Sequence, residues 1–236
     1  MDKGLSNAQI DRLGERLRAK EYGESELRLL DEYRRSFGTA YDYIVETIQR
    51  IANIPASGRP AKSTSSIIEK LKRESIRLSQ MQDIAGCRVV VNDLREQERV
   101  VTAIVAAFER VVVLDRRVTP SHGYRAVHLI IRHGRKPIEA QVRTTLQHVW
   151  AEMSEKCADI IDPAIKYGGG PATTRDVLDK AALLIRQIEE GEDALERKGT
   201  GAKSFAEELR EIRNKYVEDL QLLVHELNHV DKETSS

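Results

Sequence analysis

The sequence predicts an α+β fold in which helices flank one mixed β-sheet. Two features predict it. Short β-branched runs in the middle of the chain have the composition of buried strands, and helical patterns alternate with them along the same stretch. Toward both ends, apolar residues instead recur every three or four positions, as on one face of a helix. The 236 residues divide into a helical N-terminal region (1–54), a core with the sheet (55–162) and a helical C-terminal extension (163–236).

The first region is expected to be helical. Its apolar residues form one stripe at helical spacing, made by Leu27, Leu30, Phe37, Tyr41, Ile44, Ile48 and Ile51. The segment 54–60 holds two prolines and a glycine, which cannot continue a helix, so the stripe ends there. The next helix is expected to begin between Ser63 and Ser66.

The core is expected to contain four strands and a helix. The strands are predicted at 87–91, 111–114, 124–131 and 137–142. A helix is predicted over 94–108, with an inward face formed by Val101, Ile104, Val105 and Phe108. A short connection at 133–135 predicts that the last two strands form a hairpin.

The C-terminal part is expected to be helical again. Helices are predicted over 145–161 and around 177–188, and apolar residues repeat at near-heptad spacing from Phe205 to Leu227. This apolar seam (Phe205, Leu209, Ile212, Tyr216, Leu220, Leu223 and Leu227) is expected to be buried against the domain or a second copy. A homo-oligomer is the favoured expectation.

Composition excludes several classes of protein. Basic and acidic residues are equal in number, 38 each, so overall charge does not favour a general nucleic-acid binder. The two cysteines, Cys87 and Cys157, are too far apart in sequence to indicate a disulfide framework or a metal knuckle. No apolar run resembles a secretion signal or a membrane span. We therefore expect a cytoplasmic protein with no membrane partner.

Strand alternation brings several reactive side chains to one surface. Glu139, Gln141 and Arg143 share a face of the fourth predicted strand, and Tyr124 and His128 share a face of the third. An aromatic ring, an imidazole, a carboxylate and a guanidinium can together bind a base and phosphates while the carboxylate acts on a hydroxyl. The alternative is the solvated polar face of an ordinary hairpin.

A second carboxylate and a basic cluster extend this hypothesis. Asp83 lies at the entry to the first predicted strand, so it and Glu139 could share Mg²⁺, which favours one or two carboxylates plus phosphate oxygens. The basic residues Lys62, Lys70, Lys72, Arg73 and Arg88 could hold a triphosphate or form a solvated helix face. The sequence contains neither the P-loop pattern nor the dinucleotide-binding glycine pattern.

Four segments, at 62–73, 83–89, 123–128 and 139–144, resemble a known family. They read Lys-Ser-Thr-Ser-Ser-Ile-Ile-Glu-Lys-Leu-Lys-Arg, Asp-Ile-Ala-Gly-Cys-Arg-Val, Gly-Tyr-Arg-Ala-Val-His and Glu-Ala-Gln-Val-Arg-Thr. In this order and spacing they resemble the RelA/SpoT-type alarmone synthetases, particularly the small single-domain members. The resemblance implies a nucleotidyltransferase-like synthetase core that transfers the β,γ-diphosphate of ATP to the 3′-hydroxyl of GDP or GTP, making (p)ppGpp.

The resemblance also implies residue roles. Asp83 would bind Mg²⁺, and Glu139 would bind Mg²⁺ or activate the acceptor hydroxyl. Tyr124 would stack on the acceptor base, with His128 near the acceptor phosphates. The remaining implied roles are ATP binding by Lys62, Lys70, Arg73 and Arg88, and acceptor binding by Arg125, Gln141 and Arg143.

One departure keeps the acceptor open. Pro120-Ser121-His122 stands where family members that make guanosine alarmones usually carry Lys-x-Asn, so we expect weaker discrimination for guanine. A second hypothesis is therefore a toxic family member that pyrophosphorylates the 3′ end of tRNA or adenosine nucleotides, neutralised by an antitoxin protein. A third is an inactive nucleotide-binding module, which the intact Asp83 and Glu139 disfavour.

Overall fold

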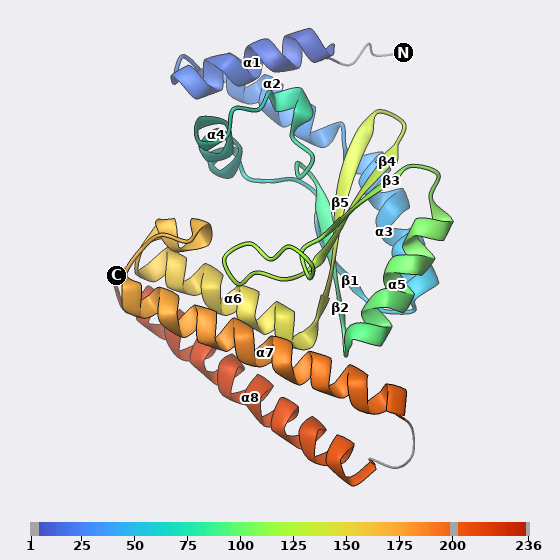
Figure 1. Cartoon of the computed structure of the whole chain (residues 1–236). Coiled ribbons are helices and arrows are strands. Elements are labelled where there is room, and N and C mark those ends of the chain that lie inside the picture. Colours follow the sequence, from blue (N-terminus) through green and yellow to red (C-terminus); the bar gives the residue numbers. More distant parts are fainter. Residues whose placement is uncertain (1–4, 199–202, 235–236) are drawn as a thin grey trace. The chain divides into compact units, whose positions relative to one another are not determined.

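The computed structural model describes residues 5–198 and 203–234. Figure 1 shows its helices and strands. In chain order they are α1 (Asn7–Ala19), α2 (Glu24–Arg35), α3 (Gly38–Ala52), β1 (Ala56–Arg59), α4 (Thr64–Arg73), η1 (Leu78–Gln80), β2 (Gly86–Val91), α5 (Leu94–Ala107), β3 (Val111–Asp115), β4 (Val127–His133), β5 (Lys136–Thr144), α6 (Thr145–Ile160), η2 (Pro163–Tyr167), α7 (Ala172–Lys198) and α8 (Lys203–Thr234).

The five strands form one sheet in the order β1-β2-β5-β4-β3. β1 pairs with β2 in antiparallel register, from Ala56 opposite Val89 to Arg59 opposite Gly86. β4 and β5 form the predicted hairpin, and Gly134 in its turn has the positive φ (61°) that tight hairpin turns favour. The α+β class with a mixed sheet is confirmed.

The chain folds into two compact units. The first comprises Met1–Val89, Thr102–Val113 and His128–Gln141. The second comprises Val90–Val101, Leu114–Val127 and Val142–Ser236. Both units interleave distant stretches of the chain, whereas the three predicted regions are continuous in sequence; that division stays a prediction.

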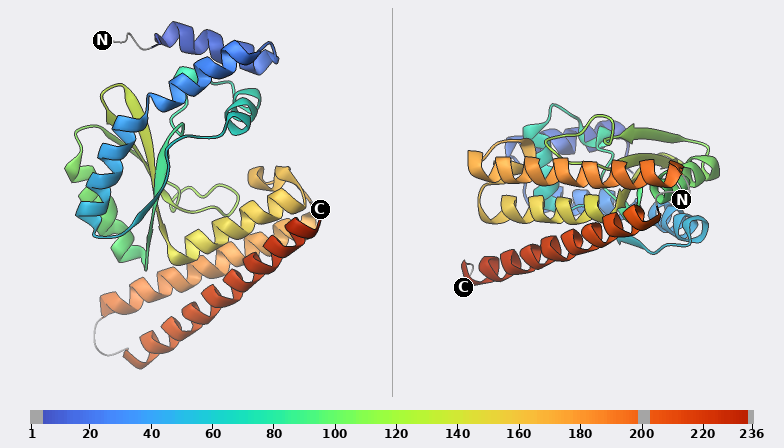
Figure 2. Two further views of the ribbon diagram at one scale, coloured as in Figure 1. Left: turned by 180° about the vertical axis from the view of Figure 1, so that it is seen from behind. Right: turned by 60° about the horizontal axis from the view of Figure 1, so that its bottom comes forward.

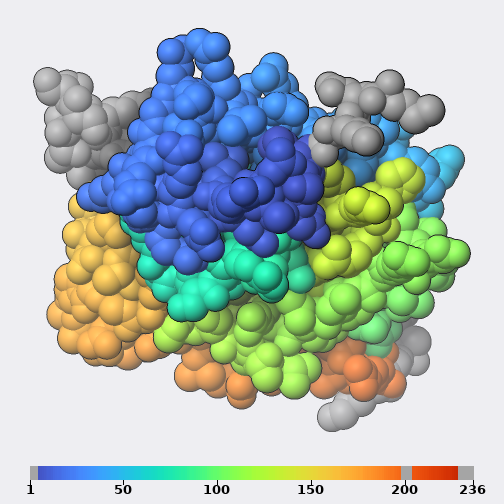
Figure 3. Space-filling view, turned by 90° about the horizontal axis from the view of Figure 1, so that it is seen from above, coloured from blue at the N-terminus to red at the C-terminus, as the bar shows by residue number. Residues whose placement is uncertain are grey.

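The first unit contains a helical layer and most of the sheet. α1 packs against α2, α4 and η1, and α3 packs against β1. Figure 3 shows α1, in dark blue, next to the green-blue residues of α4. The amino group of Lys136, at the start of β5, lies 4.8 Å and 4.4 Å from the ring centres of Tyr33 and Phe37. Its largest fully buried side chains include Leu17, Leu30, Phe37, Ile44, Ile48, Ile67 and Leu71.

The second unit is built on three helices. α6, α7 and α8 lie side by side in Figures 1 and 2 and pack against one another. Trp150 is buried in this core, and its indole Nε1 donates to the Leu178 carbonyl oxygen over 3.0 Å. The core also contains Leu146, Val149, Met153, Ala181, Ile185, Ile188 and Leu220. Sequence periodicity alone predicted the helices but not this arrangement.

Two predictions in the N-terminal part were wrong. The single stripe is interrupted, because α2 ends at Arg35 and α3 begins at Gly38. The Ser36 hydroxyl donates to the Tyr33 carbonyl oxygen over 2.6 Å, a local bond that competes with a continuing helix. Leu27 is consequently exposed. The break at 54–60 contains the strand β1, whose prolines lie just outside it and whose place at the sheet edge tolerates them.

Two predictions in the core also need correction. Val105 is 42% exposed, because the buried stripe of α5 is centred on Val100, Val101 and Ile104 and leaves Val105 to one side. The third predicted strand begins at Val127, not at Tyr124. Tyr124 instead exchanges two backbone hydrogen bonds with Ser121 across a turn, which removes it from the strand.

The apolar seam on α8 is buried only in part. Leu220 is buried, whereas Phe205, Ile212 and Leu223 are exposed. A near-heptad repeat drifts around a straight helix, so one packed face does not include every seam residue. The expected homo-oligomer stays a prediction. Neither α8 nor any other helix among the described residues has both the length and the apolar character needed to cross a membrane.

Candidate active site

Asp83 is held by two lysines in the first unit. Its Oδ2 lies 2.7 Å from Lys62 Nζ, and its Oδ1 lies 2.9 Å from Lys70 Nζ. Lys62 immediately precedes the cap of α4, where the Ser63 hydroxyl accepts from the Ser66 amide, and Lys70 lies in the last turn. Burial raises the pKa of Asp83, but the hydrogen bonds and charges of both lysines outweigh it and hold the pKa below its usual value.

Backbone contacts fix the segment that carries Asp83. The Ile84 carbonyl oxygen accepts from the Lys62 amide over 2.6 Å, and the Ala85 carbonyl oxygen accepts from the Glu139 amide over 3.2 Å. A side chain at Gly86 would place its Cβ only 2.7 Å from the Glu139 carbonyl oxygen. Glycine is therefore needed for β2 to approach β5 this closely, next to both carboxylates.

Glu139 is oriented by two partners in the same unit. Its Oε1 lies 2.8 Å from His128 Nδ1 on β4, and its Oε2 accepts from Gln141 Nε2 over 2.9 Å. Burial raises the pKa of Glu139, but His128 and Gln141 outweigh this and the opposing charge of Asp83, so the pKa is lowered. The predicted polar face of the hairpin is thus assembled around an ionised carboxylate.

Tyr124 and Arg143 meet in the second unit. The Tyr124 hydroxyl accepts from Arg143 Nη2 over 2.8 Å, and the Arg143 guanidinium carbon lies 4.9 Å from the ring centre. The turn before Tyr124 contains two residues at positive φ, His122 (51°) and Gly123 (83°). Asparagine and histidine are both enriched at positive φ, so His122 in place of the family's asparagine keeps this backbone conformation.

Arg125 points to a partner that the sequence did not suggest. It is 7% exposed, and its Nη1 lies 2.7 Å from Oε2 of Glu189, which is 2% exposed, on α7. Thr144 Oγ1 and Gln147 Nε2 also donate to Glu189, and Gln97 donates to Gln147 over 2.9 Å. We call these five residues the Glu189 cluster. This pairing gives Arg125 a structural task, and its acceptor role stays a prediction.

The remaining basic residues have mixed surroundings. Arg73 pairs with Glu74 over 2.9 Å, and Arg88 is half-buried on β2. Arg117, a candidate extra charge near the acceptor segment, is bound by Asp115 and Glu98 in the second unit. The ATP roles of Arg73 and Arg88 stay predictions.

A magnesium ion fits the chemistry of the first unit. Asp83 and Glu139 are close enough that the charge of one shifts the pKa of the other. Two carboxylates match the preference of Mg²⁺, which takes its other ligands from phosphate oxygens and water. The described residues offer no group of three or more histidine, cysteine or acidic side chains that could hold a metal alone.

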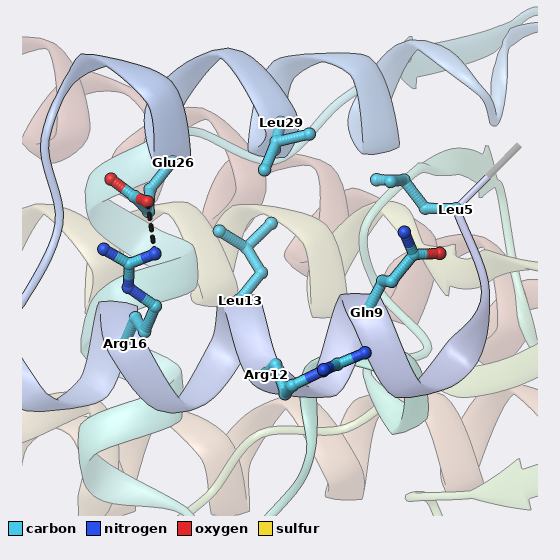
Figure 4. Close-up of a pocket in the computed structure, with 7 residues that line it drawn as sticks. All are labelled: Leu5, Gln9, Arg12, Leu13, Arg16, Glu26 and Leu29. Atoms are coloured by element: carbon cyan, nitrogen blue, oxygen red, sulfur yellow. Dashed lines mark ion pairs between the residues drawn. The ribbon is translucent and has the colours of Figure 1, made fainter.

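A separate hollow lies between α1 and α2. Figure 4 shows a cavity of about 180 Å³ lined by Leu5, Leu13 and Leu29 together with Gln9, Arg12, Arg16 and Glu26. Glu26 is paired with Arg16 over 2.6 Å. None of the predicted site residues lines this cavity, so it contributes nothing to the candidate site.

Sequence reasoning missed the Glu189 cluster, although one signal was present. Alternation placed Arg125 on the same face as Val127, Leu129 and Ile131, and these three are fully buried. A charged residue on such a face needs an acidic partner. The sequence did not identify Glu189 as that partner, because many acids occur on α7.

Comparison with known proteins identifies the core. Residues 58–158 match the family model described as "Region found in RelA / SpoT proteins". The chain contains a RelA/SpoT region. It includes Lys62, Asp83, Tyr124, Glu139 and Arg143, while Glu189 lies beyond it.

Curated relatives share this RelA/SpoT region. An uncharacterized protein of Mycobacterium bovis is 37% identical over 115 residues, which cover 47% of this chain and 42% of the relative. A GTP pyrophosphokinase of Haemophilus influenzae is 23% identical over 175 residues, covering 72% of this chain and 22% of the relative. The chain therefore matches less than half the length of these relatives.

Solved structures support the same fold. The small alarmone synthetase 1 of Bacillus subtilis has a TM-score of 0.55 at 23% identity, covering 71% of this chain and 97% of that chain. A second structure of it, bound to its product pppGpp, gives 0.55 at 22%, covering 72% and 98%. A GTP pyrophosphokinase family protein of Streptococcus pneumoniae gives 0.50 at 21%, covering 72% and 93%. The RelA/SpoT region thus lies within a small-alarmone-synthetase fold.

Proposed function

We propose that this chain is a nucleotide pyrophosphokinase that transfers the β,γ-diphosphate of ATP to the 3′-hydroxyl of GDP or GTP. One observation carries the proposal: Asp83 and Glu139 are both ionised, interact electrostatically, and are surrounded by Lys62, Lys70 and His128. Acids and ammonium groups in this arrangement suit phosphate chemistry, in which positioning and charge neutralisation supply most of the rate. The name of the Haemophilus relative supports the same reaction.

The proposed step balances with these groups. The acceptor 3′-oxygen attacks the β-phosphorus of ATP, the bond from that phosphorus to the α,β-bridging oxygen breaks, and AMP leaves. The hydroxyl proton passes to Glu139, which His128 and Gln141 hold in one orientation. Lys62 and Lys70 neutralise phosphate charge as point charges.

Magnesium completes the proposal. When bound, it would neutralise phosphate charge and orient the transferred group. Asp83 and Glu139 are the side chains we assign to hold it. Tyr124 is assigned to stack on the acceptor base, and the guanidinium of Arg143 holds the Tyr124 hydroxyl.

The test follows two labels in parallel. Full-length protein is incubated with Mg²⁺ and ATP labelled at either the γ- or the α-phosphate, with GDP, GTP, AMP, ADP or deacylated tRNA as acceptor. We expect the γ-label to move to GDP or GTP while the α-label appears in AMP. Transfer of the γ-label with release of ADP would contradict diphosphate transfer.

The same experiment separates the alternative acceptors. Each acceptor is tested at two salt concentrations, since binding of tRNA through several phosphates weakens steeply with salt. Strong, salt-sensitive labelling of tRNA without labelling of GDP or GTP would replace the guanosine acceptor by the tRNA 3′ end. Labelling of AMP, ADP or ATP alone would assign an adenosine acceptor. Nucleotide binding without transfer to any acceptor would indicate an inactive binding module.

A further inference from the structure

We infer that Glu189 of α7 is a positioning residue for the acceptor segment, defined as Gly123–Arg125. This inference rests on the proposed function and deepens it. It extends the acceptor site beyond the RelA/SpoT region, which ends at residue 158, into the C-terminal helices. Glu189 acts through Arg125 and has no assigned contact with a substrate.

The acceptor segment has little regular structure of its own. Tyr124 forms an isolated bridge with Ser121, and Arg125 belongs to no helix or strand. The next residue is held by one backbone bond, in which the Ala126 carbonyl oxygen accepts from the Arg116 amide over 2.9 Å. Side-chain anchors must therefore fix the position of the Tyr124 ring.

Glu189 supplies the first anchor. Its carboxylate binds Arg125 Nη1 over 2.7 Å, and Gln147 Nε2 donates to both of its oxygens over 3.0 Å and 3.2 Å. Thr144, which donates to the same carboxylate, also caps the N-terminus of α6. A buried carboxylate with this many donors has one favoured orientation, so it fixes Arg125 in turn.

Trp150 supplies the second anchor. A side chain at Gly123 would place its Cβ 2.7 Å from Trp150 Cζ2, so the Gly123 backbone lies directly on the indole ring. Only a hollow of about 10 Å³ remains among Gly123, Arg125, Gln147, Trp150 and neighbouring residues of α7. The acceptor segment is thus packed against helices α6 and α7 on its buried side.

The chain offers a matched control three residues along α7. Glu192 is also shielded, with a pKa that burial raises, and its carboxylate lies 3.7 Å from Arg213 on α8. This pair joins α7 to α8 and has no printed contact with the acceptor segment. Glu192→Gln therefore removes a comparable charge from the same helix.

The experiment measures KM for the acceptor and for ATP separately in Glu189→Gln, Glu192→Gln and the wild type. We expect Glu189→Gln to raise the acceptor KM about tenfold while the ATP KM stays unchanged, because the assigned ATP residues do not contact Glu189. Glu192→Gln should change neither KM. An equal rise of both KM values in Glu189→Gln, or the same effect in Glu192→Gln, would show a merely structural role and overturn the inference.

A second readout does not depend on activity. Trp150 is the only tryptophan of the chain, so its emission reports the packing of Gly123. We expect Glu189→Gln to shift this emission to longer wavelength and Glu192→Gln to leave it unchanged. If the wild type transfers diphosphate to no acceptor, the proposed function fails, and the emission alone then decides whether Glu189 positions the segment.

A milder variant protects the test against misfolding. Glu189→Asp keeps the charge but shortens the side chain, so it should shift the emission and the acceptor KM in the same direction by a smaller factor. Unchanged emission and unchanged acceptor KM in every folded variant of Glu189 would overturn the inference.

Discussion

Two acidic centres in this protein are bound in different ways. Asp83, in the first unit, contacts two ammonium groups and keeps a pKa below its usual value. Glu189, in the second unit, has one guanidinium and several uncharged donors, and burial raises its pKa. The surplus of positive charge around Asp83 is available to phosphates, whereas the Glu189 cluster uses its hydrogen bonds internally. The comparison separates a carboxylate placed for chemistry from one placed for architecture.

The largest effect is expected at the carboxylates in the first unit. Asp83→Asn and Glu139→Gln should each lower the transfer rate by about 100-fold or more, since a metal ligand or hydroxyl-orienting base is lost. ATP binding, measured by calorimetry, should not weaken. The control is Asp159→Asn, which breaks another lysine–aspartate pair (2.7 Å, to Lys166). Near-normal turnover in both site variants would refute the assignment.

A large effect on stability is expected at Glu189. Glu189→Ala leaves the buried Arg125 charge without its partner and should lower the free energy of unfolding by about 3–5 kcal/mol. The double variant Arg125→Met/Glu189→Leu should cost much less, because both charges are removed together. Denaturant unfolding of the single and double variants measures the difference. Equal losses in the two would contradict the ion-pair explanation.

A smaller effect is expected from the acceptor ring. Tyr124→Ala should weaken acceptor binding by about 1–3 kcal/mol, the usual contribution of stacking on one base. Tyr124→Phe keeps the ring and loses only the bond to Arg143, so its effect should be about 0.5–1.5 kcal/mol. The measurement is the acceptor dissociation constant. If both variants bind like the wild type, the stacking role is wrong.

The smallest effect is a difference in pH dependence. The pKa of Asp83 is lowered on folding, so its stabilising contribution is present above about 3.9, the usual aspartate pKa, and is lost as pH falls through the lowered value. The pKa of Glu189 is raised, so its contribution is present at low pH and is lost as pH rises through the raised value.

Unfolding measured against pH tests both signs. The stability gap between wild type and Asp83→Asn should shrink toward acid, and the gap between wild type and Glu189→Gln should shrink as pH rises above about 4.3, the usual glutamate pKa. Slopes of the same sign in the two comparisons would contradict the contrast between the two centres.

Sequence patterns predicted the parts of the fold that are set locally. The helix after Ser63 and the strand at Cys87–Val91 follow from capping and β-branched residues, and alternation placed Glu139 beside Gln141 on one face. The strand β1 was missed, because its pairing with β2 is a long-range event that four residues rich in small side chains do not encode. The same limit applies to Glu189, since local periodicity does not specify which acid on a long helix meets a buried arginine.

The pair of lysines on Asp83 has a consequence for the thermodynamics of nucleotide binding. A free lysine side chain loses about 1.5–2 kcal/mol of rotamer freedom when it is ordered, and here Asp83 orders both Lys62 and Lys70 before any phosphate arrives. A bound triphosphate then meets preorganised cations, which lowers the entropic cost of its capture. The same carboxylate competes with the phosphates for those cations. Asp83 thus acts at once as a template for the nucleotide and as an internal rival to it.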